Sequence, residues 1–312
     1  MNASCPWTLF DDRGKETLDT LVDVTGGLST VLSFWFILAY FNTNLKENWS
    51  YHNIGCFLLS AWIRRATSIT VNYYVDRKNE LWPGVSFCKV FAFFETFMAV
   101  HEVECLTHVC IERFVVAKYN AYGWIMPKKQ YVMFRWLCVT FSCAYALAPA
   151  LGVGGYGPDF TCSSCTMDMV LPDGWRKYIV AMIFFLRSVK PVCVMIYMLI
   201  GCKAFKKAYN DSPNNQLQRK ITQDAIVMTC ICLVCWTPIA TIRGWVVLMQ
   251  LIYGSGVFVL PTEDNVKWAL LLHWVSLTPT VLALFLLDSN IQRATLQLRL
   301  GTFLGHIKNK IE

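Results

Sequence analysis

The feature that most constrains this chain is a series of long apolar stretches, each of about the length that crosses a lipid bilayer. A helix needs about 20 mostly apolar residues to span the hydrocarbon core. Seven stretches qualify, and they are 19–41, 53–75, 85–117, 131–153, 177–203, 221–251 and 265–287. Lipid admits only helices and closed barrels, and no alternating ten-residue pattern of barrel strands occurs. The sequence therefore predicts an all-α bundle of seven transmembrane helices.

The composition agrees with a bilayer as the solvent. Charged residues make up 16% of the chain and hydrophobic residues 55%, whereas soluble domains carry about 25% charged residues. Acidic rather than basic residues, Asp11, Asp12 and Glu16, precede the first apolar stretch. We therefore expect that stretch to remain as a helix and not to be cleaved as a signal peptide. Residues 19–288 form one predicted membrane domain.

Positive charge gathers on one side of the predicted bundle. Lysine and arginine cluster near residue 46 and in 118–129, 203–220 and 293–310, all on the same side of seven spans. The positive-inside rule places that side in the cytoplasm. Residues 1–18 then form an extracellular N-terminus, and the chain is expected in the plasma membrane. This basic face explains the net charge of +7, so we do not expect a nucleic-acid partner.

The outer side carries few sites for covalent modification or metal binding. Asn2 is the one glycosylation sequon predicted to lie outside. Cys88 and Cys165 share the oxidising side and are candidates for a disulfide, while Cys5 and Cys162 either pair or stay free. The cysteines and histidines lack metal-ligand spacing, so no metal site is predicted. No catalytic motif has usable spacing, so we do not expect an enzyme.

Several motifs occur at characteristic spacing along the spans. Glu112-Arg113-Phe114 begins 24 residues after Cys88 at the basic end of the third stretch. Cys235-Trp236-Thr237-Pro238 lies in the sixth stretch, and Pro191 with Tyr197 in the fifth. The run from Ala148 to Asp168 joins the fourth stretch to the loop that contains Cys165. With these motifs the chain resembles the rhodopsin-like, class A, G-protein-coupled receptors, and among them the opsins, over nearly its whole length.

This resemblance implies a ligand pocket at the outer side and coupling to a heterotrimeric G protein at the inner side. Trp236 matches the pocket-floor switch, and Arg113 should pair with Glu112 in the resting state. Gln218 stands where many such receptors have a second acid, which implies raised basal activity. Pro238 should kink the sixth helix, since it lacks a backbone donor. The predicted coupling and switch residues are Glu112, Arg113, Phe114, Tyr197 and Pro238.

The chain departs from the opsins where they bind retinal. Opsins bind it through a lysine in the seventh helix, but Val275 or Ser276 occupies that position here, and Lys267 lies too early. The counterion position holds Phe91, although the loop acid persists as Asp159. Retinal is thus a possible cofactor, without a covalent bond expected. The predicted ligand-binding residues are Phe91, Glu95, Asp159, Trp236, Arg243 and Ser276, with Trp245 and Trp274 also near the outer cavity.

Ionisable residues inside the spans are costly and are therefore candidates for function. Glu95 has two interpretations that stay open, a counter-charge for a cationic ligand or a partner for a neighbouring helix. Arg64 and Glu102 are predicted to form an internal ion pair. His101, Glu104 and His108 suggest an internal polar network, and Lys190 is expected to pair or to extend toward the interface.

The last segment, 289–312, alternates apolar and basic residues, which predicts a short amphipathic eighth helix and a short tail. The function expected from these features is an opsin-like receptor that senses a small molecule, or a retinoid held without a covalent bond. A photoreceptor opsin or a retinal photoisomerase with covalent retinal is the first alternative. A membrane transporter is the second.

Overall fold

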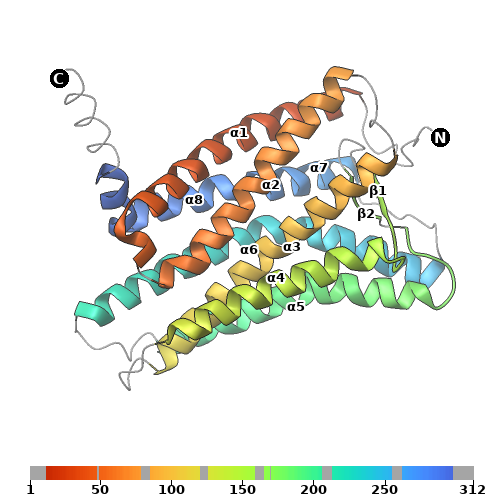
Figure 1. Cartoon of the computed structure of the whole chain (residues 1–312). Coiled ribbons are helices and arrows are strands. Elements are labelled where there is room, and N and C mark those ends of the chain that lie inside the picture. Colours follow the sequence, from red (N-terminus) through yellow and green to blue (C-terminus); the bar gives the residue numbers. More distant parts are fainter. Residues whose placement is uncertain are drawn as a thin grey trace.

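Long helices lie side by side in the computed structural model of the chain (Figure 1). The structure describes residues 12–47, 49–78, 85–119, 126–158, 165–168, 170–205, 213–254 and 262–297. Its helices are α1 (Asp12–Asn42), a 3-10 turn (Asn44–Glu47), α2 (Ser50–Lys78), α3 (Val85–Tyr119), α4 (Lys128–Ala150), α5 (Arg176–Phe205), α6 (Pro213–Tyr253), α7 (Glu263–Val275) and α8 (Leu277–Leu287). Two short strands, β1 (Tyr156–Pro158) and β2 (Cys165–Met167), pair antiparallel.

The helices account for all seven predicted spans, so the all-α seven-helix prediction is confirmed. Among the described residues, five segments are long and apolar enough to cross a membrane by composition alone. The two remaining spans are α2 and α3, which carry the buried ionisable residues discussed below. The predicted bounds were closest for α3, α5 and the seventh span, whereas α6 begins eight residues before the predicted start at 221.

The seventh span is interrupted at Ser276, between α7 and α8. Pro279 lies in the first turn of α8 and has no backbone N–H to donate to the carbonyl of the preceding turn. The break between α7 and α8 is therefore explained by Pro279. Prolines also lie inside α5 and α6, at Pro191 and Pro238, as the sequence predicted.

The distribution of exposed and buried side chains suits a lipid environment rather than water. Large apolar side chains on the outside of the bundle are exposed, among them Val31, Trp136 and Leu286. Among the described residues, the three largest fully buried side chains are instead arginines, Arg64, Arg65 and Arg113. Since an ionisable group is costly in the bilayer unless it faces the interior and finds partners, this distribution fits a multi-pass membrane protein.

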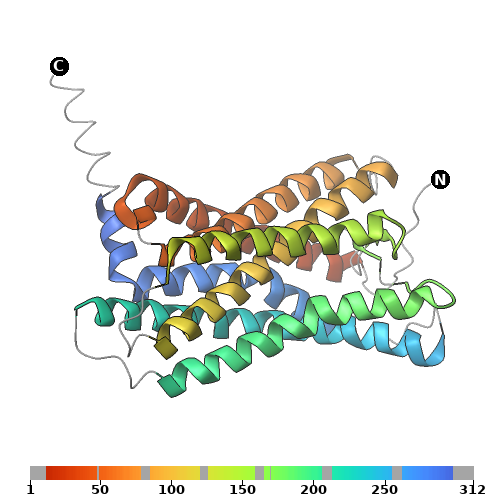
Figure 2. The same cartoon turned by 60° about the horizontal axis from the view of Figure 1, so that its bottom comes forward.

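Helix α3 is the centre of the bundle. It contacts α2, α4, α5, α6 and both strands, and it crosses the bundle obliquely (Figure 2). The seventh span packs between α6 and α1 and closes the ring of helices (Figure 2). Any group on α3 can therefore reach several other helices.

The two ends of the bundle differ. The strands β1 and β2 lie at one end, which we call the hairpin end, and α1 begins there (Figure 1). Residues 289–297, which are helical, lie at the opposite end, which we call the tail end (Figure 1). The described chain thus starts and finishes at opposite ends, as an odd number of spans requires. The rest of the predicted amphipathic segment, beyond residue 297, lies outside the described residues.

Candidate functional site

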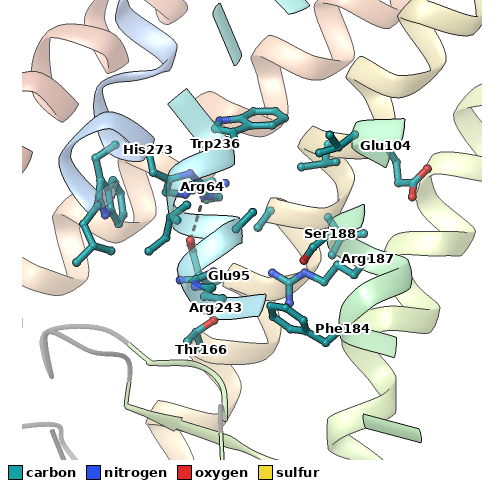
Figure 3. Close-up of a pocket in the computed structure, with 18 of the residues that line it drawn as sticks. Arg64, Glu95, Glu104, Thr166, Phe184, Arg187, Ser188, Trp236, Arg243 and His273 are labelled. Carbon is teal, nitrogen blue, oxygen red and sulfur yellow. Dashed lines mark hydrogen bonds and ion pairs between the residues drawn. The ribbon is translucent and has the colours of Figure 1, made fainter. Parts of the chain in front are cut away.

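A cavity of about 120 Å³ lies inside the bundle, in the half toward the hairpin end (Figure 3). Side chains from α2, α3, α5, α6, α7 and β2 line it. By the same measure one water needs about 10–15 Å³, so the cavity accommodates several waters or one small organic molecule. Its wall combines an apolar surface with the charged side chains Arg64, Glu95, Glu104, Arg187 and Arg243.

Arg64 connects three helices at the side of this cavity. Its Nη1 donates to Glu102 Oε2 at 2.6 Å, and its Nε lies 3.0 Å from Glu95 Oε1. Its Nη2 lies 2.8 Å from His273 Nε2 on α7. The predicted Arg64–Glu102 ion pair is therefore present, and it has a second carboxylate that the sequence did not assign to it.

The position of Glu95 favours its interpretation as a partner for a neighbouring helix over that as a counter-charge for a cationic ligand. Besides Arg64, it accepts a hydrogen bond from Ser68 Oγ on α2 at 3.2 Å. Its carboxylate still borders the cavity, but a cation and a hydroxyl of α2 already bind it. The role of Glu95 as the counter-charge of a ligand stays a prediction, and these two contacts make Glu95 a poor candidate for that role.

Arg65 is a second buried cation beside this group, and sequence reasoning gave it no role. Its side chain is fully buried, its Nη2 donates to the His273 carbonyl at 2.9 Å, and its guanidinium lies 4.4 Å from the centroid of the Trp274 ring. A cation over the face of an indole ring is a favourable arrangement. Arg65 therefore helps to position the His273-Trp274 segment of α7, which lines the cavity.

The floor of the cavity lies at the interruption of the seventh span. Trp236 Nε1 on α6 donates to Ser276 Oγ at 3.1 Å, and Ser276 Oγ donates to the His273 carbonyl at 2.7 Å. Trp236 lines the cavity, as predicted, whereas Ser276 lies just behind it. The hydrogen bond joins α6 to the broken turn of α7, so movement of Trp236 is coupled to that turn.

The remaining predicted pocket residues divide into three groups. Arg243 and Trp274 line the cavity. Phe91 and Trp245 are not among its lining residues: Phe91 packs with Cys88 and Cys165, and Trp245 is 43% exposed on the surface of α6. The structure thus places Phe91 beside the disulfide rather than on the cavity wall, and its role as a ligand contact stays a prediction. Asp159 lies outside the described residues.

A disulfide fixes the β-hairpin over α3. Cys88, near the start of α3, bonds to Cys165 on β2, with Cα atoms 5.6 Å apart, so the predicted pairing is confirmed. The next residue, Thr166, borders the cavity. Burial raises the pKa of the Asp168 carboxyl. This carboxyl accepts a hydrogen bond from the Val170 N–H at 2.9 Å. Burial also raises the pKa of the Tyr156 hydroxyl to about 12. The hairpin is therefore an ordered cover for the cavity.

At the cavity wall and beyond it toward the tail end, polar groups of α3 bind partners on three other helices. His101 Nδ1 lies 2.7 Å from Ser60 Oγ on α2, and Lys190 Nζ on α5 donates to Glu104 Oε1 at 2.8 Å. His108 Nδ1 lies 3.3 Å from Cys138 Sγ on α4. These contacts form the internal network that the sequence predicted.

The described lysines are not lining residues of the cavity. Of the described residues that line it, none is a lysine. Lys190 pairs with Glu104 and lies over the Phe141 ring, and Lys267 of α7 is not a lining residue. Retinal in the cavity would therefore lack an amine with which to form a Schiff base, unless a residue outside the described part supplied one.

At the tail end, Arg113 joins α3 to α2 and α6. It pairs with Glu112, donates to Gln218 Oε1 on α6 at 2.9 Å, and donates to Ser50 Oγ on α2 at 3.1 Å. Glu112 accepts a further hydrogen bond from Asn53 Nδ2 at 2.9 Å. The predicted Glu112–Arg113 contact is thus present, and Gln218 is its link to α6.

Phe114 packs beside this group against α5. Its ring lies 6.2 Å from the ring of Tyr197, which is 66% exposed. A Cβ on Gly201 would overlap the Phe114 ring, so the glycine permits the close approach of α5 to α3. Asn2 lies outside the described residues.

Comparisons with known proteins agree with this geometry. The family model for the 7 transmembrane receptor (rhodopsin family) matches residues 65–255, which is more than half of the chain. Opsin-5 from Mus musculus is 26% identical over 175 residues, 51% of this chain and 45% of the relative. Visual pigment-like receptor peropsin from Homo sapiens is 24% identical over 197 residues, 56% of each chain. The chain therefore spans about half the length of the curated relatives that it matches.

The fold has a counterpart among solved structures. The crystal structure of squid rhodopsin superposes with a TM-score of 0.75 at 16% identity, and the match covers 94% of this chain and 89% of that chain. At this identity the likeness concerns the fold alone.

Proposed function

The chain belongs to the rhodopsin family of seven-transmembrane receptors, and on that premise we propose that it is an opsin-like chemoreceptor. It senses a small molecule, or a retinoid held without a covalent bond, in the cavity beneath the hairpin. It passes the signal to a heterotrimeric G protein at the tail end. We propose the plasma membrane as its location, with residues 1–18 outside and the segment 289–312 in the cytoplasm.

The observation that carries this proposal is that α3 and α6 join the cavity to the Arg113 group. Trp236 of α6 forms the cavity floor, and Gln218 of the same helix accepts a hydrogen bond from Arg113. Pro238 lies two residues beyond Trp236 and weakens the helix there. A ligand that displaces Trp236 can therefore swing the tail end of α6 away from Arg113, which is the transition that opens a groove for a partner.

The contact between Arg113 and α6 makes the proposal testable without a known ligand. Gln218 offers a neutral acceptor to the Arg113 guanidinium, whereas a carboxylate at this position adds the attraction of opposite charges and can accept two parallel hydrogen bonds. We expect Gln218→Glu to lower basal nucleotide exchange on purified heterotrimeric G proteins about fivefold or more, and Gln218→Ala to raise it. Gln223→Glu adds the same charge at an exposed position five residues along α6 and serves as the control.

Two results would contradict the proposal. The first is an absence of exchange by the wild-type receptor and all three variants with every G-protein class. The second is an equal change in Gln218→Glu and Gln223→Glu, because a general charge effect would then replace the specific contact.

The covalent photoreceptor or photoisomerase remains the second candidate, since relatives of this chain are opsins. It requires a lysine at the cavity. The described cavity wall offers arginines instead, and a guanidinium does not form a Schiff base with an aldehyde. The chemoreceptor is for this reason the function that the geometry supports best.

A further inference from the structure

Two buried aspartates meet where α6 packs against the end of the seventh span. Asp224 lies on α6 and Asp288 directly follows α8, and the two residues are 4% and 1% exposed. Their carboxyls lie within reach of a hydrogen bond to each other. One helical turn away, Lys220 Nζ of α6 donates to Ser289 Oγ at 2.5 Å. Helix α6 and the segment after α8 are therefore in direct polar contact at this level, beside the α6–α8 packing visible in Figure 2.

Asp288 has hydrogen-bond donors for both of its carboxyl oxygens. Tyr51 Oη of α2 donates to Oδ2 at 2.5 Å, and the Asn290 backbone N–H donates to Oδ1 at 2.8 Å. The Ile291 N–H also points to Oδ1, at 3.4 Å. Asp288 is thus placed as an acceptor that joins α2 to the start of the tail segment.

Asp224 is placed differently. Its Oδ2 is buried and has no hydrogen-bond donor among the described residues. A buried polar atom without a partner is costly, and two carboxyls that share one site resist ionising together. One proton between Asp224 and Asp288 removes both costs, because a protonated Asp224 donates to the Asp288 carboxylate.

Other charged or titratable side chains surround the two aspartates. By element they are Tyr51 on α2, Glu112 and Arg113 on α3, Lys203 on α5, Lys220 on α6 and Arg293 after α8. Arg113 meets α6 at Gln218, which is six residues, or about 9 Å, before Asp224 along the helix. Lys203 and Arg293 are exposed. The contact between the aspartates therefore lies on the same end of α6 as the Arg113 contact.

We propose that Asp224 and Asp288 share one proton that holds α6 against the seventh span, and that the receptor releases this proton when α6 moves outward. The inference rests on the proposed function in that it takes the outward movement of α6 as the activating step. Separation brings both carboxyls into water, where each ionises near neutral pH. Because the open form then binds fewer protons, a rise in pH favours the open form and a fall in pH favours the closed form.

Basal nucleotide exchange measures this coupling without a known ligand. The full-length receptor is placed in nanodiscs of neutral phospholipid with a purified heterotrimeric G protein, and exchange by the G protein alone is subtracted at each pH. We expect exchange by the wild-type receptor to rise with pH, by at most about tenfold per pH unit for one released proton. Asp264→Asn removes the same charge at an exposed position on α7 and should keep the wild-type pH profile.

Two substitutions at position 224 should act in opposite directions. The amide of Asp224→Asn donates to Asp288 without a shared proton, so exchange should stay low as pH rises. Asp224→Ala removes the contact, so exchange at acidic pH should exceed that of the wild type about threefold or more, the factor that one hydrogen bond typically contributes. The ratio of the wild type to each variant cancels the pH effects of Glu112 and of the G protein.

Two further measurements detect the proton without a G protein. The infrared spectrum of the purified receptor at neutral pH should contain a carbonyl stretch of a protonated carboxylic acid that is missing in Asp224→Asn. The thermal midpoint should fall more steeply with rising pH in the wild type than in Asp224→Asn, because a proton bound only in the folded state stabilises that state until it is lost.

Four results would overturn the inference. They are a wild-type exchange that falls as pH rises, parallel pH profiles of the wild type and Asp224→Asn, identical infrared spectra of these two proteins in the carboxylic-acid region, and suppression of exchange by sodium at constant ionic strength that is lost in Asp224→Asn. The last result would show a bound cation in place of the proton. The first result is decisive even if the variants at 224 fail to fold.

The failure of the proposed function would be seen separately. A receptor that activates no G protein would contradict the proposed function, while the infrared spectra and the thermal midpoints would still decide whether Asp224 and Asp288 share a proton.

Discussion

At the scale of single residues, Arg64 shows how a charge is accommodated inside this bundle. It is 2% exposed and lies within 3.0 Å of a carboxylate on each side, from Glu95 and Glu102. Its loss would leave two buried carboxylates next to Arg65 alone. Removing one partner of a buried ion pair costs about 3–5 kcal/mol.

We therefore predict that Arg64→Gln strongly lowers both the thermal midpoint and the surface expression of the receptor. Adding Glu102→Gln should recover part of the loss, because the double variant no longer strands that carboxylate. Thermal unfolding of purified protein and antibody labelling of intact cells measure the two effects. Arg64→Gln at full expression and unchanged midpoint would show that the pair is dispensable.

At the scale of elements, the packing of α5 on α3 depends on the absence of one side chain. A Cβ at Gly201 would come closer to the Phe114 ring than real Cβ contacts allow. The ring or the helix would have to move, and overpacking of this kind costs about 1–3 kcal/mol.

Gly201→Ala is accordingly expected to lower the thermal midpoint and to change basal signalling, since Phe114 adjoins Arg113. Gly244→Ala is the matched control on α6, where nothing lies within 4 Å of the added methyl group. Combining Gly201→Ala with Phe114→Leu should restore stability by making room. Equal midpoints for the two alanine variants would rule out this packing constraint.

The α7–α8 junction shows what a sequence can and cannot predict at this scale. Pro279 and the missing lysine at 275–276 were visible in the sequence, and so was the apolar length of the span. That Ser276 accepts the Trp236 indole N–H could not be read from spacing, because the contact depends on how α6 rotates against α7. The partners of Arg64 were half predictable for the same reason. The resemblance to class A receptors indicated Glu102, while Glu95 and His273 required the packed bundle.

At the scale of the whole molecule, the number of spans followed from apolar length, and their expected orientation followed from the distribution of lysine and arginine. The charged residues that line the cavity could not be predicted from the sequence. Arg187 was part of an apolar run in the fifth stretch, and only the fold shows that it borders the same space as Arg243. An acid at 95 was compatible with a cationic ligand or with a partner on a neighbouring helix, and only the fold places Arg64 beside it.

The disulfide also affects the whole molecule, because it joins two residues that are 77 positions apart in the chain. A cross-link of this kind contributes about 2–4 kcal/mol. We predict that Cys88→Ser lowers the thermal midpoint and weakens ligand binding, because the hairpin over the cavity loses its attachment to α3. Cys193→Ser, at an exposed free cysteine of α5, should change neither quantity. Equal behaviour of the two variants would refute a structural role for the bond.

The central claim is that an opsin-type bundle here encloses a cavity for a ligand that is not covalently bound. The most direct measurement is the visible spectrum of the purified receptor after incubation with retinal, recorded before and after acid denaturation. We expect no visible pigment to survive the acid, because the described cavity wall lacks a lysine. A band that persists as the protonated Schiff base of a lysine would contradict the account and establish a covalent photopigment.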